Sequence, residues 1–145
     1  MAGSGGRGAR SLLRWRAVSA LFLLAMGGIH LYLVFHGVGG VLGALFVVNA
    51  VGALVLAISV VVVRGRLVPV ACVLSLLFML GTLLALVIAL TVGLFGIRET
   101  IDFQLVPTTI VVESIGTIVL AVTTALAFRL GRGTRTGLGR AHTDA

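Results

Sequence analysis

Three side chains able to do chemistry lie inside long apolar stretches of this chain: the imidazole of His30, the carboxamide of Asn49 and the carboxyl of Glu113. An ionisable group is costly inside such a stretch, so it marks a candidate functional site. Counted along a helix from the centre of each stretch, the three groups lie roughly 4, 5 and 6 Å to the same side of the midplane. We therefore predict an interior polar cluster of His30, Asn49 and Glu113, in which the first two residues supply hydrogen bonds to the carboxyl.

This interior polar cluster has two interpretations. Polar side chains that face one another between membrane helices hold those helices together by hydrogen bonds, and a cluster of that kind needs no ligand. Alternatively, the same groups bind a proton, a small molecule or a cofactor. The residue types and their depths leave both interpretations open.

A second set of polar residues lies near one end of the apolar stretches. His36 follows His30 by about 600° of helix, so the two rings point about 120° apart and do not form a pair of ligands on one helix. Near His36 we expect the only charged outer connection of the chain, around residues 98–102. We predict an outer mouth formed by His36, Thr91, Arg98, Glu99 and Asp102. Nothing in the spacing indicates a metal site.

The residues that position these groups belong to four apolar stretches, at 17–38, 42–63, 67–95 and 106–128. Each is long enough to cross the hydrocarbon core of a bilayer, about 30 Å thick, as a helix. In lipid every backbone polar group must be hydrogen-bonded within its own segment, which favours helices. With 59% hydrophobic and 10% charged residues, the composition excludes an ordinary soluble domain. We predict an all-α, antiparallel bundle of four transmembrane helices.

The basic residues predict the orientation of this bundle. The chain has 11 basic residues, all of them arginine, and every one except Arg98 lies beside the same ends of the four stretches. Because basic residues next to spans are retained in the cytoplasm, we predict cytoplasmic termini and a bacterial plasma membrane location. These arginines are expected to meet anionic lipid headgroups rather than nucleic acid. Residues 1–16 and 129–145, rich in glycine and arginine, are predicted to be flexible basic arms.

Helical spacing indicates which faces of the stretches point inward. On the fourth stretch, polar and small residues recur every three or four positions, at Thr109, Glu113, Gly116, Thr117, Leu120 and Thr124. Comparable strips include Gly27 and His30 on the first stretch and Asn49 and Ala53 on the second. Small residues allow close approach of membrane helices, so these strips should be the packed faces.

The sequence predicts no enzyme. It contains no lysine, which excludes a phosphate-binding loop ending in Gly-Lys-Ser/Thr and a Schiff-base lysine. We also find no nucleophile with a neighbouring base and no metal-binding helix motif. We expect a noncatalytic membrane component or a small-molecule-binding bundle without a cofactor.

Two other functions stay open. One is a redox role in which His30 and Glu113 hold a quinone, or His30 ligates haem. The other is a transporter or proton pathway, for which four spans per chain would require a homo-oligomer. Partners other than the lipid bilayer would be a second copy of the chain or another membrane protein.

Three segments also carry a resemblance. Residues 27–33 (GGIHLYL), 45–53 (LFVVNAVGA) and 90–99 (LTVGLFGIRE) are similar to recurring segments of small, uncharacterised four-span membrane proteins of high-GC bacteria. This resemblance covers about residues 17–128, and the chain also resembles, more distantly, the DoxX-like four-helix membrane proteins. The resemblance implies the four-span topology and no particular activity, but its segments include His30, Asn49, Arg98 and Glu99.

Overall fold

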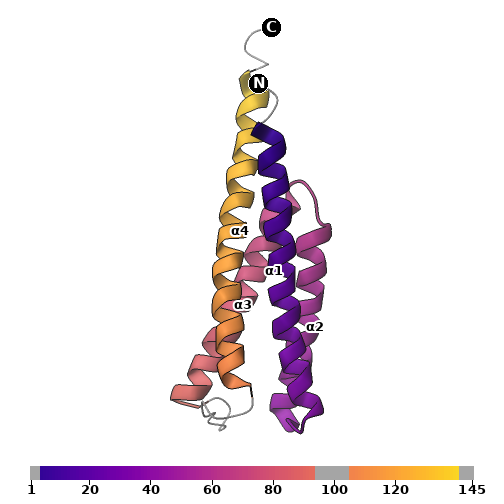
Figure 1. The fold of residues 1–145 in the computed structure, drawn as a ribbon, viewed down its shortest axis with the longest axis vertical. Helices are drawn as coiled ribbons and strands as arrows, with labels where there is room; N and C mark the ends of the chain where they lie inside the picture. The colour runs from indigo at the N-terminus through magenta and orange to yellow at the C-terminus, as the bar shows by residue number, and fades with distance from the viewer. Residues whose placement is uncertain (1–3, 94–104, 141–145) are drawn as a thin grey trace.

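The protein is built from four long helices. The computed structural model describes residues 4–93 and 105–140, with side chains described for 6–93 and 105–131. The helices are α1 (Ser4–Phe35), α2 (Gly40–Val62), α3 (Leu67–Thr91) and α4 (Val106–Arg140) (Figure 1). All four contain a segment long and apolar enough to cross a membrane. This confirms the all-helical fold and indicates a multi-pass integral membrane protein.

The first and last helices, α1 and α4, extend beyond the apolar stretches. Helix α1 already begins at Ser4, and α4 continues to Arg140, so both include residues that the sequence assigned to flexible arms. The two prolines of the chain lie elsewhere, and nothing else in these segments interrupts the backbone hydrogen bonds of a helix. The end of the apolar composition therefore does not coincide with the end of the helix.

The third helix is shorter than its apolar stretch. Helix α3 ends at Thr91, and Gly93 follows with φ of +88°, a left-handed conformation that glycine adopts without steric cost. The amide of Gly93 donates to the carbonyl of Ile88 at 2.9 Å, which closes the last turn. Helix α3 is also visibly tilted against the other helices (Figure 1).

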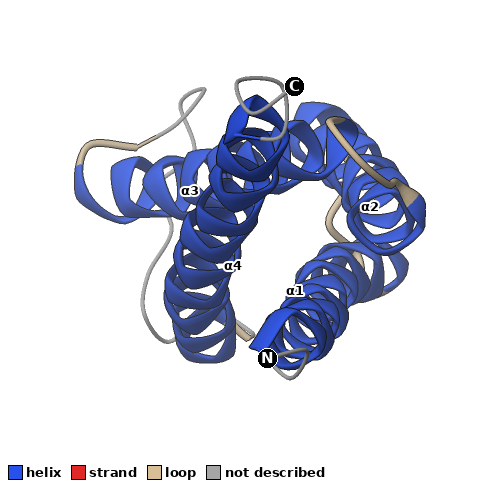
Figure 2. Ribbon diagram, turned by 90° about the horizontal axis from the view of Figure 1, so that it is seen from above, coloured by secondary structure: helices blue, strands red, loops and turns tan. Residues whose placement is uncertain are grey.

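The helices surround a common interior, with α4 beside α1 as well as α3 (Figure 2). Helix α1 packs most extensively on α2, whereas α2 contacts α3 much less. Helix α1 begins and helix α4 ends at the same end of the molecule, toward which the connection between α2 and α3 also lies (Figure 1). We call this the basic end, because it carries Arg14, Arg64, Arg66 and Arg129. The opposite end, with the connection at residues 36–39, is called the loop end.

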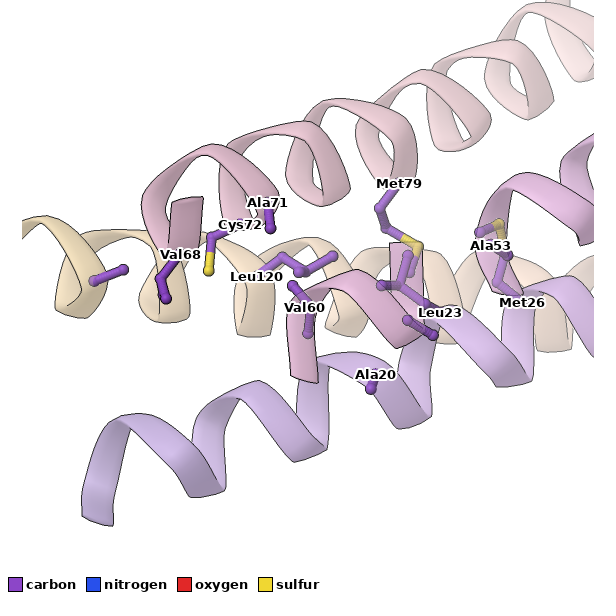
Figure 3. Packing of buried hydrophobic residues seen from close by; sticks show 12 residues of the cluster. Ala20, Leu23, Met26, Ala53, Val60, Val68, Ala71, Cys72, Met79 and Leu120 are labelled. Carbon is purple, nitrogen blue, oxygen red and sulfur yellow. The ribbon is translucent and has the colours of Figure 1, made fainter. Parts of the chain in front are cut away.

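The core consists of apolar side chains from all four helices. Leu23, Met26, Met79 and Leu120 are completely buried, and Figure 3 shows them converging between the helices. The outward faces carry many exposed leucine, valine and isoleucine side chains, which suit contact with lipid. The interior polar residues are thus held in a frame whose outer surface is apolar.

Candidate functional site

Glu113 is the most unusual side chain of the interior. It lies on α4, is 0% exposed, and neither of its carboxyl oxygens has a hydrogen-bond partner. Thr82 of α3 lies beside the carboxyl. Its hydroxyl, however, donates to the Met79 carbonyl at 2.8 Å. The two carboxyl oxygens are therefore buried beside Thr82 without a donor directed at them.

Asn49 on α2 shows the same feature in part. Its amide nitrogen donates to the sulfur of Met26 on α1, at a distance of 3.6 Å. Its carbonyl oxygen Oδ1 is buried and has no partner. A thioether is a weak acceptor, so the carboxamide gains little from this contact and its strong acceptor atom stays unpaired.

His30 on α1 is buried and points back along its own helix. Its Nδ1 lies 2.9 Å from the carbonyl oxygen of Met26. Because a carbonyl only accepts, Nδ1 carries the hydrogen, and Nε2 of the neutral ring is then an acceptor. The ring also meets the ring of Phe46 on α2 edge to face, with centroids 4.7 Å apart. His30 thus uses its donor within α1.

Two close helix contacts place the carboxyl and the carboxamide at one height. A Cβ on Gly52 would lie 2.9 Å from the Phe78 ring, and a Cβ on Gly116 would lie 2.9 Å from Cε of Met79. Phe78 and Met79 are neighbours on α3, so the two glycines lie at nearly the same level. The carboxamide and the carboxyl each precede their glycine by one helical turn, which is about 5 Å toward the loop end.

This level contains one residue from each helix. Met26 of α1 contacts Asn49 of α2, and Thr82 of α3 lies beside Glu113 of α4. We call these four residues the acceptor layer. His30 follows Met26 by one turn toward the loop end, and its ring leans back toward the layer.

The three residues of the predicted interior polar cluster are therefore all inward-facing, but they do not hydrogen-bond one another among the described residues. His30 and Asn49 both engage Met26. The expected hydrogen bonds from His30 and Asn49 to Glu113 are not found. The physical reason is local: the imidazole finds a carbonyl acceptor one turn back on its own helix, and the carboxamide donor is taken by a sulfur atom.

The structure describes two of the five residues of the predicted outer mouth. His36 is exposed at the loop end, where its ring stacks on Tyr32 with centroids 3.7 Å apart and its Nδ1 lies 2.8 Å from the Tyr32 carbonyl oxygen. Thr91 is exposed and donates to the carbonyl of Val87 at 2.8 Å. Arg98, Glu99 and Asp102 lie outside the described residues, so the mouth stays a prediction.

Arg16 has a structural role that sequence reasoning missed. It is 9% exposed, although its position before the first apolar stretch grouped it with headgroup-facing arginines. Its guanidinium donates to three main-chain carbonyls at the end of α2: Val60 at 2.6 Å, Val61 at 2.9 Å and Val63 at 2.5 Å. These carbonyls lack partners within the helix, and the helix dipole favours a cation there. Arg16 therefore caps α2 from α1.

A second missed contact joins α1 to α4. The hydroxyls of Ser19 and Thr123 are both completely buried and lie 2.8 Å apart. Thr123 also donates within α4 to the carbonyl of Val119 at 2.8 Å. Ser19 and Arg16 continue the three- and four-residue spacing of the Gly27 and His30 strip toward the basic end. Extending that strip would have found both residues.

The interior offers oxygen atoms that can accept hydrogen bonds. Within the described parts of the chain, no three histidine, cysteine or acidic side chains are grouped to hold a metal ion. The acceptor layer instead presents unpaired oxygen atoms from Asn49 and Glu113. Such atoms bind groups that donate hydrogen bonds or carry positive charge.

Comparison of this chain with protein families, with curated proteins and with solved structures found no match. Its function is therefore argued from the site itself.

Proposed function

We propose that this protein is a noncatalytic membrane component that binds a small molecule in the interior of its bundle, at Glu113. The observation that supports the proposal is the complete burial of this carboxyl with both oxygens unpartnered. An unsatisfied buried polar group costs about 1–3 kcal/mol, and more when it is charged. A bound molecule that donates hydrogen bonds to the carboxyl would remove this cost.

The alternative interpretation, that the interior polar cluster only holds helices together, is less well supported. Interhelical hydrogen bonds do exist in this bundle: Ser19 bonds Thr123 and Arg16 bonds the end of α2 nearer the basic end, and Asn49 makes a weak one to the sulfur of Met26. Glu113 makes none. Since the carboxyl contributes no bond between helices, its retention in the interior is better explained by a ligand.

The orientation in the membrane is part of this proposal. The basic end carries exposed Arg14, Arg64, Arg66 and Arg129, whereas the acid among the described residues, Glu113, is in the interior. Basic residues next to spans favour the cytoplasmic side. We place the four helices as antiparallel spans with both termini in the cytoplasm, and the exposed arginines against anionic headgroups of a bacterial plasma membrane.

Native mass spectrometry of the full chain, extracted in mild detergent, tests the binding function. Wild type should retain a small molecule that Glu113→Leu loses, and the mass identifies its class, including a quinone or haem. Thr124→Val is the matched control, because Thr124 is also buried on α4 but donates only within its helix, to Leu120. An identical mass spectrum of bound species for wild type and Glu113→Leu would refute the proposal.

A further inference from the structure

The hydroxyl groups nearest to the Glu113 carboxyl already have their hydrogens in use. On α3, the hydroxyl of Thr82 donates to the carbonyl of Met79 at 2.8 Å. On α4, Thr109 and Thr117 lie one turn before and one turn after the carboxyl, and both donate to main-chain carbonyls four residues earlier. A hydroxyl has a single hydrogen to donate, so these three threonines leave the carboxyl oxygens without a donor.

The described arginines are also remote from this carboxyl. The buried Arg16 is held at the end of α2 by main-chain carbonyls, among them that of Val60. Its neighbour Trp15 meets Thr123 through a main-chain carbonyl, and Thr123 follows Glu113 on α4 by ten residues, a rise of about 15 Å. Neither a hydrogen bond nor a salt bridge from Arg16 therefore compensates the carboxyl.

Two titratable side chains face the interior from the other helices. His30 on α1 uses the hydrogen of its Nδ1 at the Met26 carbonyl, 2.9 Å away. Cys72 on α3 precedes Thr82 by ten residues, which places it about 15 Å away along the helix, toward the basic end. Helix α2 has no titratable residue between Gly40 and Val62. None of these groups is placed to give the carboxyl a hydrogen.

The form of Glu113 that suits these surroundings is the neutral acid. A carboxylate would be a buried charge without a donor, and burying an unpaired charge costs far more than burying a neutral polar group. Because Thr82 spends its hydrogen on Met79, its Oγ1 offers only lone pairs to the carboxyl beside it. A carboxylic acid can direct its hydrogen to those lone pairs, whereas a carboxylate can only face them.

We propose that Glu113 is a proton-binding site: inside the bundle it is a neutral carboxylic acid whose hydrogen points toward Thr82 Oγ1. The proton comes from water and forms the O–H bond of the acid. This inference goes beyond the binding function proposed above, because it concerns the protein without a bound molecule. A proton supplies both the positive charge and the hydrogen that the surrounding side chains do not provide.

Infrared spectroscopy of the full chain in a maltoside detergent reads this protonation state, because the carbonyl stretch of a neutral carboxylic acid lies apart from the bands of carboxylates and amides. In D2O at neutral pH, wild type should show the acid band and Glu113→Gln should lack it. Glu99→Gln, which changes another of the four acids of the sequence, should keep the band. A wild-type spectrum without the acid band, or a band that is unchanged in Glu113→Gln, would overturn the proposal.

The position of the band tests the direction of the hydrogen. A hydrogen bond from the acid lowers its carbonyl frequency, so Thr82→Val, which removes the acceptor, should move the band to higher frequency. Thr124→Val is the matched control, since its buried hydroxyl donates within α4 to Leu120. The same band position in wild type and Thr82→Val would overturn the assignment of Thr82 as the acceptor.

The outcomes separate the proton site from the proposed binding function. If native mass spectrometry finds no retained molecule while the acid band is present, the binding function fails and the proton site stands. If a molecule is retained while the acid band is absent, the proton site fails and the binding function stands.

Discussion

At the scale of single residues, the buried Arg16 and the buried Glu113 differ in how their polar atoms are satisfied. Arg16 donates to three carbonyls at the end of a helix, so its burial is compensated by hydrogen bonds and by the helix dipole. Glu113 is buried more completely and has no compensation of this kind. A residue that stabilises the fold and a residue that we propose to bind a ligand should respond differently to removal.

Removal of the Glu113 carboxyl should not destabilise the ligand-free protein. Glu113→Leu replaces an unsatisfied polar group by an apolar one, so we expect unchanged stability or a gain of about 1–2 kcal/mol. Ser19→Ala, which breaks a real interhelical bond, should cost about 1 kcal/mol. The buried thiol of Cys72 makes both measurable, because a thiol-reactive fluorogenic dye reports unfolding in detergent. A large loss of stability in Glu113→Leu would show that the carboxyl is a structural group.

Removal of the Arg16 guanidinium should destabilise the bundle. Arg16→Ala leaves the last carbonyls of α2 without their donor, and we expect a loss of about 2–4 kcal/mol. Arg16→Lys keeps the charge but not the fork of donors, so its loss should be smaller. Arg14→Ala, on an exposed position of the same helix, should change little. Equal unfolding curves for Arg14→Ala and Arg16→Ala would contradict the capping role.

At the scale of elements, the bundle depends on places where a missing side chain lets two helices touch. A Cβ on Gly27 of α1 would lie 2.9 Å from Cβ of Ala53 on α2. The neighbouring Gly28 faces outward, and a Cβ there would meet nothing within 4 Å. Adjacent glycines of one helix therefore have different roles, because only one of them lies on the packed face.

This pair of glycines provides a matched test of helix packing. Gly27→Ala forces α1 and α2 apart and should cost about 1–3 kcal/mol. Gly28→Ala adds a methyl group in open space and gains helix propensity, so it should be neutral or stabilising by up to about 1 kcal/mol. Thermal unfolding, followed through the Cys72 thiol, compares the two variants. The same melting temperature for both would mean that the α1–α2 contact is not close.

At the scale of the whole molecule, the exposed charges of the described residues lie at one end, and the outer surface between the ends is predominantly apolar. The exposed arginines lie at the basic end, and the connection at residues 36–39 lies at the loop end. The acceptor layer lies between them. An orientation with the basic end in the cytoplasm would place this layer inside the bilayer, away from both aqueous phases.

Reporter fusions test this orientation. A green fluorescent protein fused to the C-terminus should be fluorescent and an alkaline phosphatase fused there inactive, because both ends are placed in the cytoplasm. In a Cys72→Ala background, Gly39→Cys should react with a membrane-impermeant thiol reagent added to intact cells. Active phosphatase at the C-terminus would reverse the orientation.

The sequence by itself determined the number and type of elements and the inward faces of the helices. Apolar length predicts that α2 and α3 are helices long enough to span a membrane, because a backbone in lipid must bond within its own segment. The same spacing argument brought His30, Asn49 and Glu113 to inward faces, since an unpaired polar group in lipid is costly. These are local properties of one segment and its solvent.

Only the tertiary structure decided which polar groups are satisfied. Hydrogen bonds depend on which atoms of other helices lie within about 3 Å, and this cannot be read from the spacing along one chain. For that reason the bonds between helices were found at Arg16 and Ser19, where sequence reasoning did not place them. For the same reason Glu113, for which such bonds were expected, has none.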